Sequence, residues 1–137
     1  MNPRLVGLER LTPRIGPKIG WKAKVRLRLR PKDAHYSGGL VAGAKILELF
    51  GDAATALCLR ETRGRDQGLF RAYQSVDFLE PVRSGDTVLA TATIIKVGHT
   101  SRTMKFIALK VRPRRVIVAK ATGTVVIPEL RTKPLKK

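Results

Sequence analysis

The stretch Lys32-Asp33-Ala34-His35-Tyr36-Ser37-Gly38-Gly39-Leu40-Val41-Ala42-Gly43-Ala44-Lys45-Ile46-Leu47-Glu48-Leu49-Phe50-Gly51-Asp52 decides the fold. It begins with acid, imidazole and phenol side chains and passes through two glycines into a helical pattern. From residue 40 to residue 58, apolar and small residues recur on one broad side, which predicts a long amphipathic helix. Ser37 is the predicted N-cap, and Gly38 and Gly39 form the turn that leads into the helix.

The segments around this helix alternate as β-strands do. Residues 24–30 place three apolar side chains on one face and four basic side chains on the other. Further strands are predicted over 69–79, 87–97, 101–111 and 116–127, and short links between these four favour antiparallel neighbours. In the 69–79 strand, the pattern assigns one face to Phe70, Ala72, Val76 and Phe78. The sequence therefore predicts an α+β fold.

One helix cannot cover both faces of a five-stranded sheet. The sheet is therefore expected to curl around the helix, and its outer side or its edge to seek a partner. A homodimer is the simplest solution.

The length of 137 residues fits one domain. We expect a basic N-terminal extension over 1–22, a folded domain over 23–128 and a basic C-terminal tail over 129–137. Cys58 is the only cysteine, which excludes an internal disulfide and a cysteine-based metal site. The lone cysteine favours a reducing, cytoplasmic setting. The sequence also shows no apolar run long enough for a membrane span and no signal-peptide pattern.

The formal charge of +18 is concentrated in the flanks. Residues 1–32 carry +9, residues 33–100 carry −1 and residues 101–137 carry +10. Basic flanks attract polyanions such as nucleic acid, acidic lipid surfaces or the phosphates of coenzyme A. A general adaptation of the surface explains the charge equally well.

Several motifs resemble those of the 3-aminobutyryl-CoA and β-alanyl-CoA ammonia-lyases, enzymes of amino-acid fermentation that include lysine degradation and have the hotdog fold. The specific part is Asp33-Ala34-His35-Tyr36 followed by the glycine-rich start of the helix. The segments 76–86 and 96–102 resemble hotdog acyl-CoA enzymes more generally. The resemblance spans most of residues 25–127 and implies a five-stranded antiparallel sheet wrapped around one central helix.

The resemblance implies reversible loss of ammonia from a 3-aminoacyl-CoA, with coenzyme A as part of the substrate and no metal or permanently bound cofactor. A base must remove the α-proton, and donors must stabilise the enolate. The backbone of Gly38 and Gly39 is expected to supply those donors at the helix N-terminus. The resemblance further implies a homodimer or larger homo-oligomer, such as a trimer of dimers.

The candidate catalytic side chains have alternative structural roles. Asp33 and His35 are candidates for the base and its orienting partner, although Asp33 equally suits a turn cap and His35 an ordinary loop position. Tyr36 could donate to the carbonyl or wall the acyl pocket. Asp52 and Asp77 are further candidates for a site shared between subunits, or surface acids.

A basic corner between two strands is the predicted binding site for coenzyme A phosphates. Its candidate residues are Lys96, Gly98, Thr100, Ser101 and Arg102, and the alternative is an ordinary polar hairpin. His99 alone indicates no function, and Cys58 suits a place in the core.

Two other functions remain open at the level of sequence. A hotdog acyl-CoA thioesterase would use water and a carboxylate base, but no acid occurs at the predicted start of the helix before Glu48. A nucleic-acid-associated module would have to bind through phosphates, because only 5% of the residues are aromatic.

Overall fold

The computed structural model describes residues 19–128, and the expected extension and tail lie largely outside that range. Five strands, one long helix and two short 3₁₀ turns follow in the order β2, η3, η4, α1, β3, β4, β5, β6. Their bounds are β2 Lys22–Arg28, η3 Pro31–Asp33, η4 Ser37–Gly39, α1 Gly43–Glu61, β3 Leu69–Phe78, β4 Thr87–Val97, β5 Ser101–Arg112 and β6 Val116–Val126.

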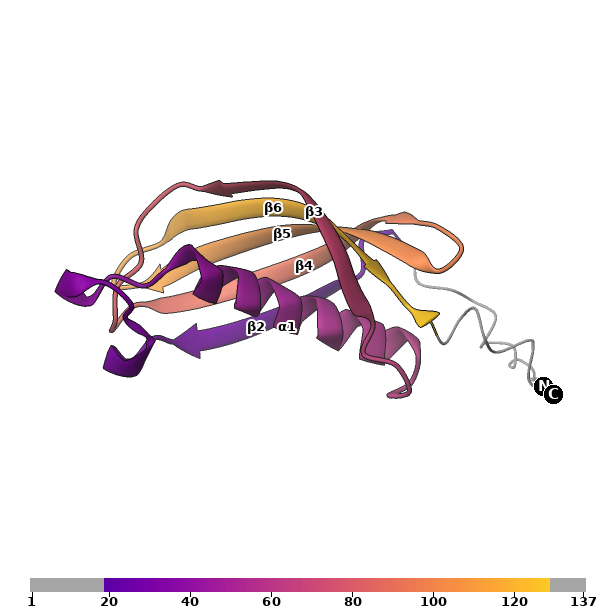
Figure 1. Cartoon of the computed structure of the whole chain (residues 1–137), viewed down its shortest axis with the longest axis horizontal. Helices are drawn as coiled ribbons and strands as arrows, with labels where there is room; N and C mark the ends of the chain where they lie inside the picture. The colour runs from indigo at the N-terminus through magenta and orange to yellow at the C-terminus, as the bar shows by residue number, and fades with distance from the viewer. Residues whose placement is uncertain (1–18, 129–137) are drawn as a thin grey trace.

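The sheet is antiparallel throughout, in the order β2-β4-β5-β6-β3, and it curls over α1 (Figure 1). The predicted α+β hotdog architecture is therefore confirmed. The expected neighbours of β3 were wrong, because β3 pairs with β6 and lies at the opposite edge from β2. Residues 79–86 instead carry the chain past the start of α1, where Val41 N–H donates to Val82 O over 2.8 Å.

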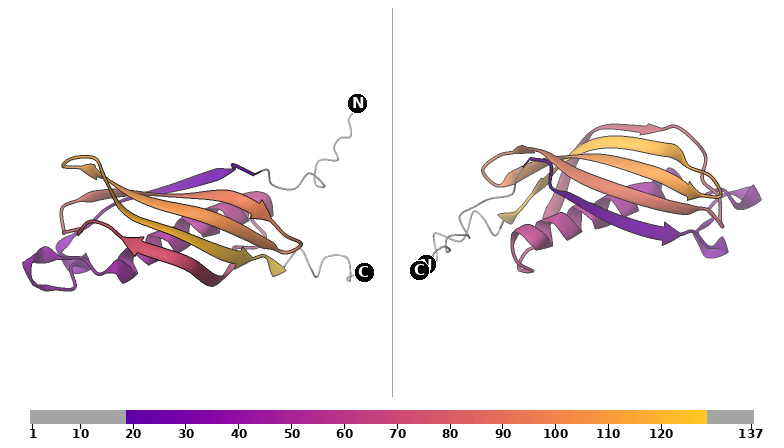
Figure 2. Two further views of the ribbon diagram at one scale, coloured as in Figure 1. Left: turned by 90° about the horizontal axis from the view of Figure 1, so that it is seen from above. Right: turned by 180° about the vertical axis from the view of Figure 1, so that it is seen from behind.

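The core lies between the helix and the concave face of the sheet. Alternate residues of β4 and β5 are fully buried there, and Phe50 of the helix stacks on Phe106 of β5 with ring centroids 5.2 Å apart. Figure 2 shows the same arrangement from above and behind, with α1 on one side of the sheet only. Within residues 19–128, no helix covers the other face of the sheet.

Three local predictions were wrong. The first strand covers residues 22–28 rather than 24–30. In β3, register shifts after Phe70 and after Tyr73 change which side chains face the core, so Ala72 and Phe78 are exposed. The helix begins at Gly43 with Ala42 as N-cap, so Ser37 caps nothing and belongs to a separate turn.

Candidate active site

A cavity of about 410 Å³ lies where α1 begins. Phe78 and the segment that follows β3 form one wall, and the first turn of the helix forms another. Gly43 lets this wall approach the helix closely, because a Cβ there would lie 2.7 Å from Cζ of Phe78 and the ring would have to shift. The cavity is lined by Val41, Gly43, Ile46, Phe78, Leu79, Glu80, Pro81, Val82 and Val118.

The start of α1 supplies backbone donors beside this cavity. No side chain caps the helix, and within the described residues no hydrogen-bond acceptor contacts the N–H of Gly43 or Ala44. Free N–H groups at a helix N-terminus carry a partial positive charge. The first turn contains no acidic residue. The geometry can therefore stabilise a developing oxyanion, but it places no carboxylate in that turn.

Gly38 and Gly39 do not have the position that the sequence suggested. They lie in η4, several residues before the helix, and both adopt φ of 76°. Gly39 O accepts a hydrogen bond from Ser84 N over 2.8 Å, which ties this turn to the 79–86 segment. The expected donors at the helix N-terminus are thus replaced by Gly43 and Ala44.

Asp33 lies at the end of η3 and is held by two neighbours. Its Oδ2 accepts from Arg30 N–H over 2.8 Å, and its Oδ1 lies 3.5 Å from Lys45 Nζ. The hydrogen bond from Arg30 and the charge of Lys45 lower the pKa of Asp33. Lys45 also approaches Glu48, at 3.4 Å. The carboxylate of Asp33 is therefore ionised and linked to the first turn of α1.

His35 and Tyr36 lie on the exposed loop between η3 and η4. Their backbone N–H groups both donate to Leu40 O, over 2.8 and 3.1 Å, and their rings make an edge contact with centroids 4.9 Å apart. Both side chains are exposed. The bridge between Ala34 and Val41 places this loop next to a residue that lines the cavity. Neither His35 nor Tyr36 itself lines the cavity within one protomer.

Asp52 and Asp77 are also outside the cavity. Asp52 is exposed on α1, and Asp77 is exposed on β3 opposite Lys120. The structure therefore does not bring either acid together with Asp33 in the protomer.

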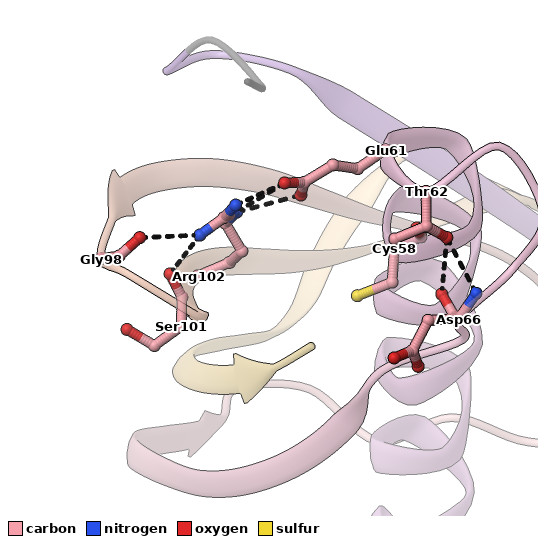
Figure 3. A network of polar contacts seen from close by, with 7 residues as sticks. All are labelled: Cys58, Glu61, Thr62, Asp66, Gly98, Ser101 and Arg102. Atoms are coloured by element: carbon pink, nitrogen blue, oxygen red, sulfur yellow. Dashed lines mark hydrogen bonds and ion pairs between the residues drawn. The ribbon is translucent and has the colours of Figure 1, made fainter. Parts of the chain in front are cut away.

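Arg102 has a structural role that differs from the expected phosphate contact. Its guanidinium forms an ion pair with Glu61 and donates to the carbonyl oxygens of Gly98 and Ser101 over 2.9 and 2.8 Å (Figure 3). The side chains of Arg102 and Glu61 are only 5% and 7% exposed. Arg102 thus fastens the β4–β5 turn to the end of α1 and is not free to bind phosphate.

The other residues of the predicted phosphate corner remain accessible to different degrees. Lys96 is exposed, whereas Gly98, Thr100 and Ser101 are half-buried. The corner lies at the C-terminal end of the 19-residue helix, whereas the cavity lies at its N-terminal end. These two ends are about 27 Å apart along the helix axis.

Glu80 is the residue that sequence reasoning missed. Among residues 19–128 it is the only ionisable residue that lines the cavity, and it is exposed. The signal was present in the sequence, because an acid interrupts the apolar Phe78-Leu79-x-Pro81-Val82 segment. An acid beside an apolar cavity suits a ligand that carries positive charge.

Two groups, one buried and one half-buried, are unsuited to proton transfer near neutral pH. Burial raises the pKa of the Cys58 thiol to about 12 and that of Tyr73 to about 12. Cys58 is buried in the core, as expected. Within residues 19–128, no group of three His, Cys, Asp or Glu side chains converges to hold a metal ion, and no helix is long and apolar enough to cross a membrane.

Comparison with known proteins gives consistent matches. Residues 38–116 match the Thioesterase superfamily. The 3-aminobutyryl-CoA ammonia lyase of Acetoanaerobium sticklandii is 40% identical over 122 residues, which cover 79% of this chain and 95% of that protein.

Two solved structures resemble the fold closely. The β-alanyl-CoA:ammonia lyase of Clostridium propionicum matches with a TM-score of 0.71 and 34% identity, covering 80% of this chain and 87% of that one. A hexameric thioesterase of Yersinia pestis matches with a TM-score of 0.68 and 26% identity, covering 78% and 86%.

Proposed function

The chain belongs to the hotdog-fold ammonia-lyases that act on CoA thioesters, within the Thioesterase superfamily, and we propose that it catalyses reversible elimination of ammonia from a 3-aminoacyl-CoA. The acyl group is 3-aminobutyryl or β-alanyl, which gives crotonyl-CoA or acryloyl-CoA. The observation that carries the proposal is the cavity at the start of α1, which combines free helix N–H groups with a mostly apolar lining and one exposed carboxylate at its wall.

The reaction requires stabilisation of an enolate at the thioester. We assign this role to the N–H groups of Gly43 and Ala44, because they lie at the positive end of the helix dipole beside the cavity. The α-proton passes to a base, and the C–N bond then breaks as the C=C bond forms. Ammonia leaves and takes up the proton that the base removed.

The ammonium group of the substrate requires a negative partner. We assign this role to Glu80, the one ionisable residue around the cavity. Glu80 is exposed in the protomer, so its carboxylate is accessible to a cationic group that enters the cavity. A cavity that served uncharged acyl chains would gain nothing from a carboxylate.

His35 is the proposed base, oriented by the loop that also contains Asp33 and Tyr36. An imidazole is the side chain that most readily exchanges a proton near neutral pH. Asp33 is a weaker base because its pKa is lowered, and it suits the positioning of the loop through Arg30 and Lys45. Asp52 and Asp77 are kept as candidates for the site of a neighbouring copy.

The site is proposed to be completed in a homo-oligomer. Lys96, Thr100 and Ser101 are candidate ligands for the phosphates of coenzyme A, but their corner lies about 27 Å along α1 from the cavity. One pantetheine arm does not span that distance, so a second copy must bring its corner to the cavity. The exposed Leu69 and Phe78 of edge strand β3, at 57% and 53%, favour a homodimer through this edge.

A trimer of dimers is the larger assembly that we propose, because a related thioesterase is hexameric. A cytoplasmic location and a role in amino-acid fermentation, with lysine as one source of the substrate, accompany this proposal. Lys22 begins β2 and Trp21 packs against the core, so we further propose that residues 1–19 and 129–137 are additions to the catalytic domain.

Thioester hydrolysis is the competing function, because the superfamily contains thioesterases. The first turn of α1 argues against it, since Lys45 stands there and no acidic residue is present.

The test is to mix purified protein with crotonyl-CoA or acryloyl-CoA and ammonium, and to follow both enoyl absorbance and free thiol. Loss of absorbance without thiol supports the lyase, whereas release of one free thiol for each enoyl-thioester consumed supports hydrolysis.

Variants locate the site within that assay. His35→Ala is expected to lower kcat by about 100-fold, as for loss of a general base. Asp33→Asn is expected to lower kcat less, because it disturbs only the position of the loop. Wild-type rates in both variants would show that this loop does not contain the site.

A further inference from the structure

Four neighbouring strands of the sheet are strongly basic. Strands β2, β4, β5 and β6 together carry ten Lys or Arg residues and no Asp or Glu. The eight acids of residues 19–128 all lie on α1, on β3 or in the turns and loops. Basic side chains are therefore concentrated on four strands of the sheet, and acidic side chains lie elsewhere. Packing of the hotdog fold does not require this separation of charge.

Most of these cations point away from the helix. Along β2, the residues Lys22, Lys24, Arg26 and Arg28 are exposed, while the alternate residues pack against the core. On β5, Lys105 is exposed between two buried neighbours, as is Lys120 on β6. The left view of Figure 2 looks onto this outer face.

The strand register brings these side chains together. Lys22 lies opposite Thr93, which lies beside Lys105 of the next strand. In the adjacent row, Lys24 lies opposite Thr91, which lies beside Ile107 of the next strand. Strands are about 4.8 Å apart and alternate residues about 6.6 Å apart, so the three ammonium groups share one small area.

These cations surround a groove of about 340 Å³. Its floor is apolar toward one end, with Leu89, Leu109 and Ile117, and hydroxylated toward the other, with Thr91 and Thr93. Its remaining lining residues are Lys22, Lys24, Lys105, Ile107 and Arg115. Within residues 19–128, none of its four cations forms a salt bridge. Mutual repulsion is thus uncompensated and would be relieved by an anion.

We propose that this outer groove binds single-stranded nucleic acid. Its phosphates contact Lys22, Lys24 and Lys105, and its bases lie over the apolar floor. The exposed cations along β2 are spaced every 6.6 Å or so, which suits successive phosphates of an extended strand. This function is separate from the proposed lyase reaction, since the groove and the cavity at α1 share no lining residue.

Other occupants fit the same surface less well. A second copy of the chain would bring an equally basic outer face or a helix with few acids. A bilayer requires apolar side chains that protrude, whereas here the apolar residues form the floor of a groove. No aromatic residue lines the groove, so binding is expected to depend on phosphates and to be insensitive to base sequence.

The test uses the full chain and a fluorescent 12-nucleotide single strand of mixed sequence. The double variant Lys24→Gln/Lys105→Gln removes two proposed contacts. Its matched control, Arg63→Gln/Arg65→Gln, removes the same charge from the loop after α1. The slope of log affinity against log salt is expected to fall by about 1.4 in the double variant, at roughly 0.7 per phosphate contact.

Affinity at fixed salt should fall about tenfold or more in the double variant and less than about threefold in the control. Enoyl-CoA amination should stay at the wild-type rate in both variants, so the result is independent of the lyase proposal. Equal loss in both variants would overturn the groove, because binding would then follow net charge alone. Binding to vesicles with 30% phosphatidylglycerol but not to the oligonucleotide would also overturn it.

Discussion

The ion pair between Glu61 and Arg102 allows a prediction with a defined magnitude. Both side chains are almost fully buried, and the guanidinium has two further carbonyl acceptors. Removing one member of such a pair costs about 3–5 kcal/mol, because the other charge is left buried without its partner. We therefore expect Glu61→Leu to lower the free energy of unfolding by that amount and Tm by roughly 10 °C.

The double variant Glu61→Leu/Arg102→Met separates the ion pair from simple packing. It replaces both charges by apolar groups, so we expect it to recover most of the lost stability, to within about 1–2 kcal/mol of wild type. Urea unfolding at one fixed protein concentration measures all four proteins, since assembly of subunits would otherwise change the apparent stability. Additive effects of the two single changes, or a cost below about 1 kcal/mol for Glu61→Leu, would refute the reasoning.

The same double variant tests the role of Arg102 in function. If Arg102 only fastens the β4–β5 turn, the KM for enoyl-CoA should change by less than about threefold. A rise of tenfold or more would mean that Arg102 binds the phosphates of the substrate after all.

Three further predictions follow from single residues. Gly43→Ala should reduce amination of enoyl-CoA at least tenfold, because its Cβ would lie 2.7 Å from the Phe78 ring. The control Gly51→Ala has open space around the new Cβ. It should leave activity unchanged and raise the free energy of unfolding by about 0.5–1 kcal/mol. Asp33→Asn should lower the free energy of unfolding at pH 6, and the difference from wild type should shrink as the pH falls below 3.8. The reason is that a carboxyl group with a lowered pKa stabilises the fold only while it is ionised. A stability difference that does not change with pH would contradict this. Cys58 should resist thiol reagents at pH 8 in the folded protein and react after unfolding in urea, and rapid reaction in buffer alone would show that it is not buried.

The architecture could be predicted because each element has a strong period. The alternation of β2, β4 and β5 and the apolar stripe of α1 need no tertiary information. The start of the helix could not be located, since Ser37-Gly38-Gly39 reads as a cap and turn in any sequence. Tertiary contacts hold that loop apart from the helix, among them the bridges from Leu40 to Arg83 and from Ala34 to Val41.

The site was predicted only in outline. The loop with Asp33 and His35 was found through its motif. The position of this loop relative to the cavity depends on how residues 79–86 pass the start of α1, which the sequence does not reveal. Arg102 looked like a phosphate ligand because its buried partner, Glu61, is 41 residues away in the chain. Glu80 was missed because its importance arises from the apolar lining around it.

The most direct measurement compares wild type with Glu80→Gln in the amination of crotonyl-CoA and acryloyl-CoA over a range of ammonium concentrations. The account predicts that wild type consumes the enoyl-thioester without releasing thiol. In the variant, Gln fills nearly the same volume as Glu without the charge, so the comparison isolates the role of the carboxylate. The account further predicts that Glu80→Gln raises the KM for the 3-aminoacyl-CoA at least tenfold in the reverse direction. Release of free thiol by wild type, or an unchanged KM in Glu80→Gln, would contradict it.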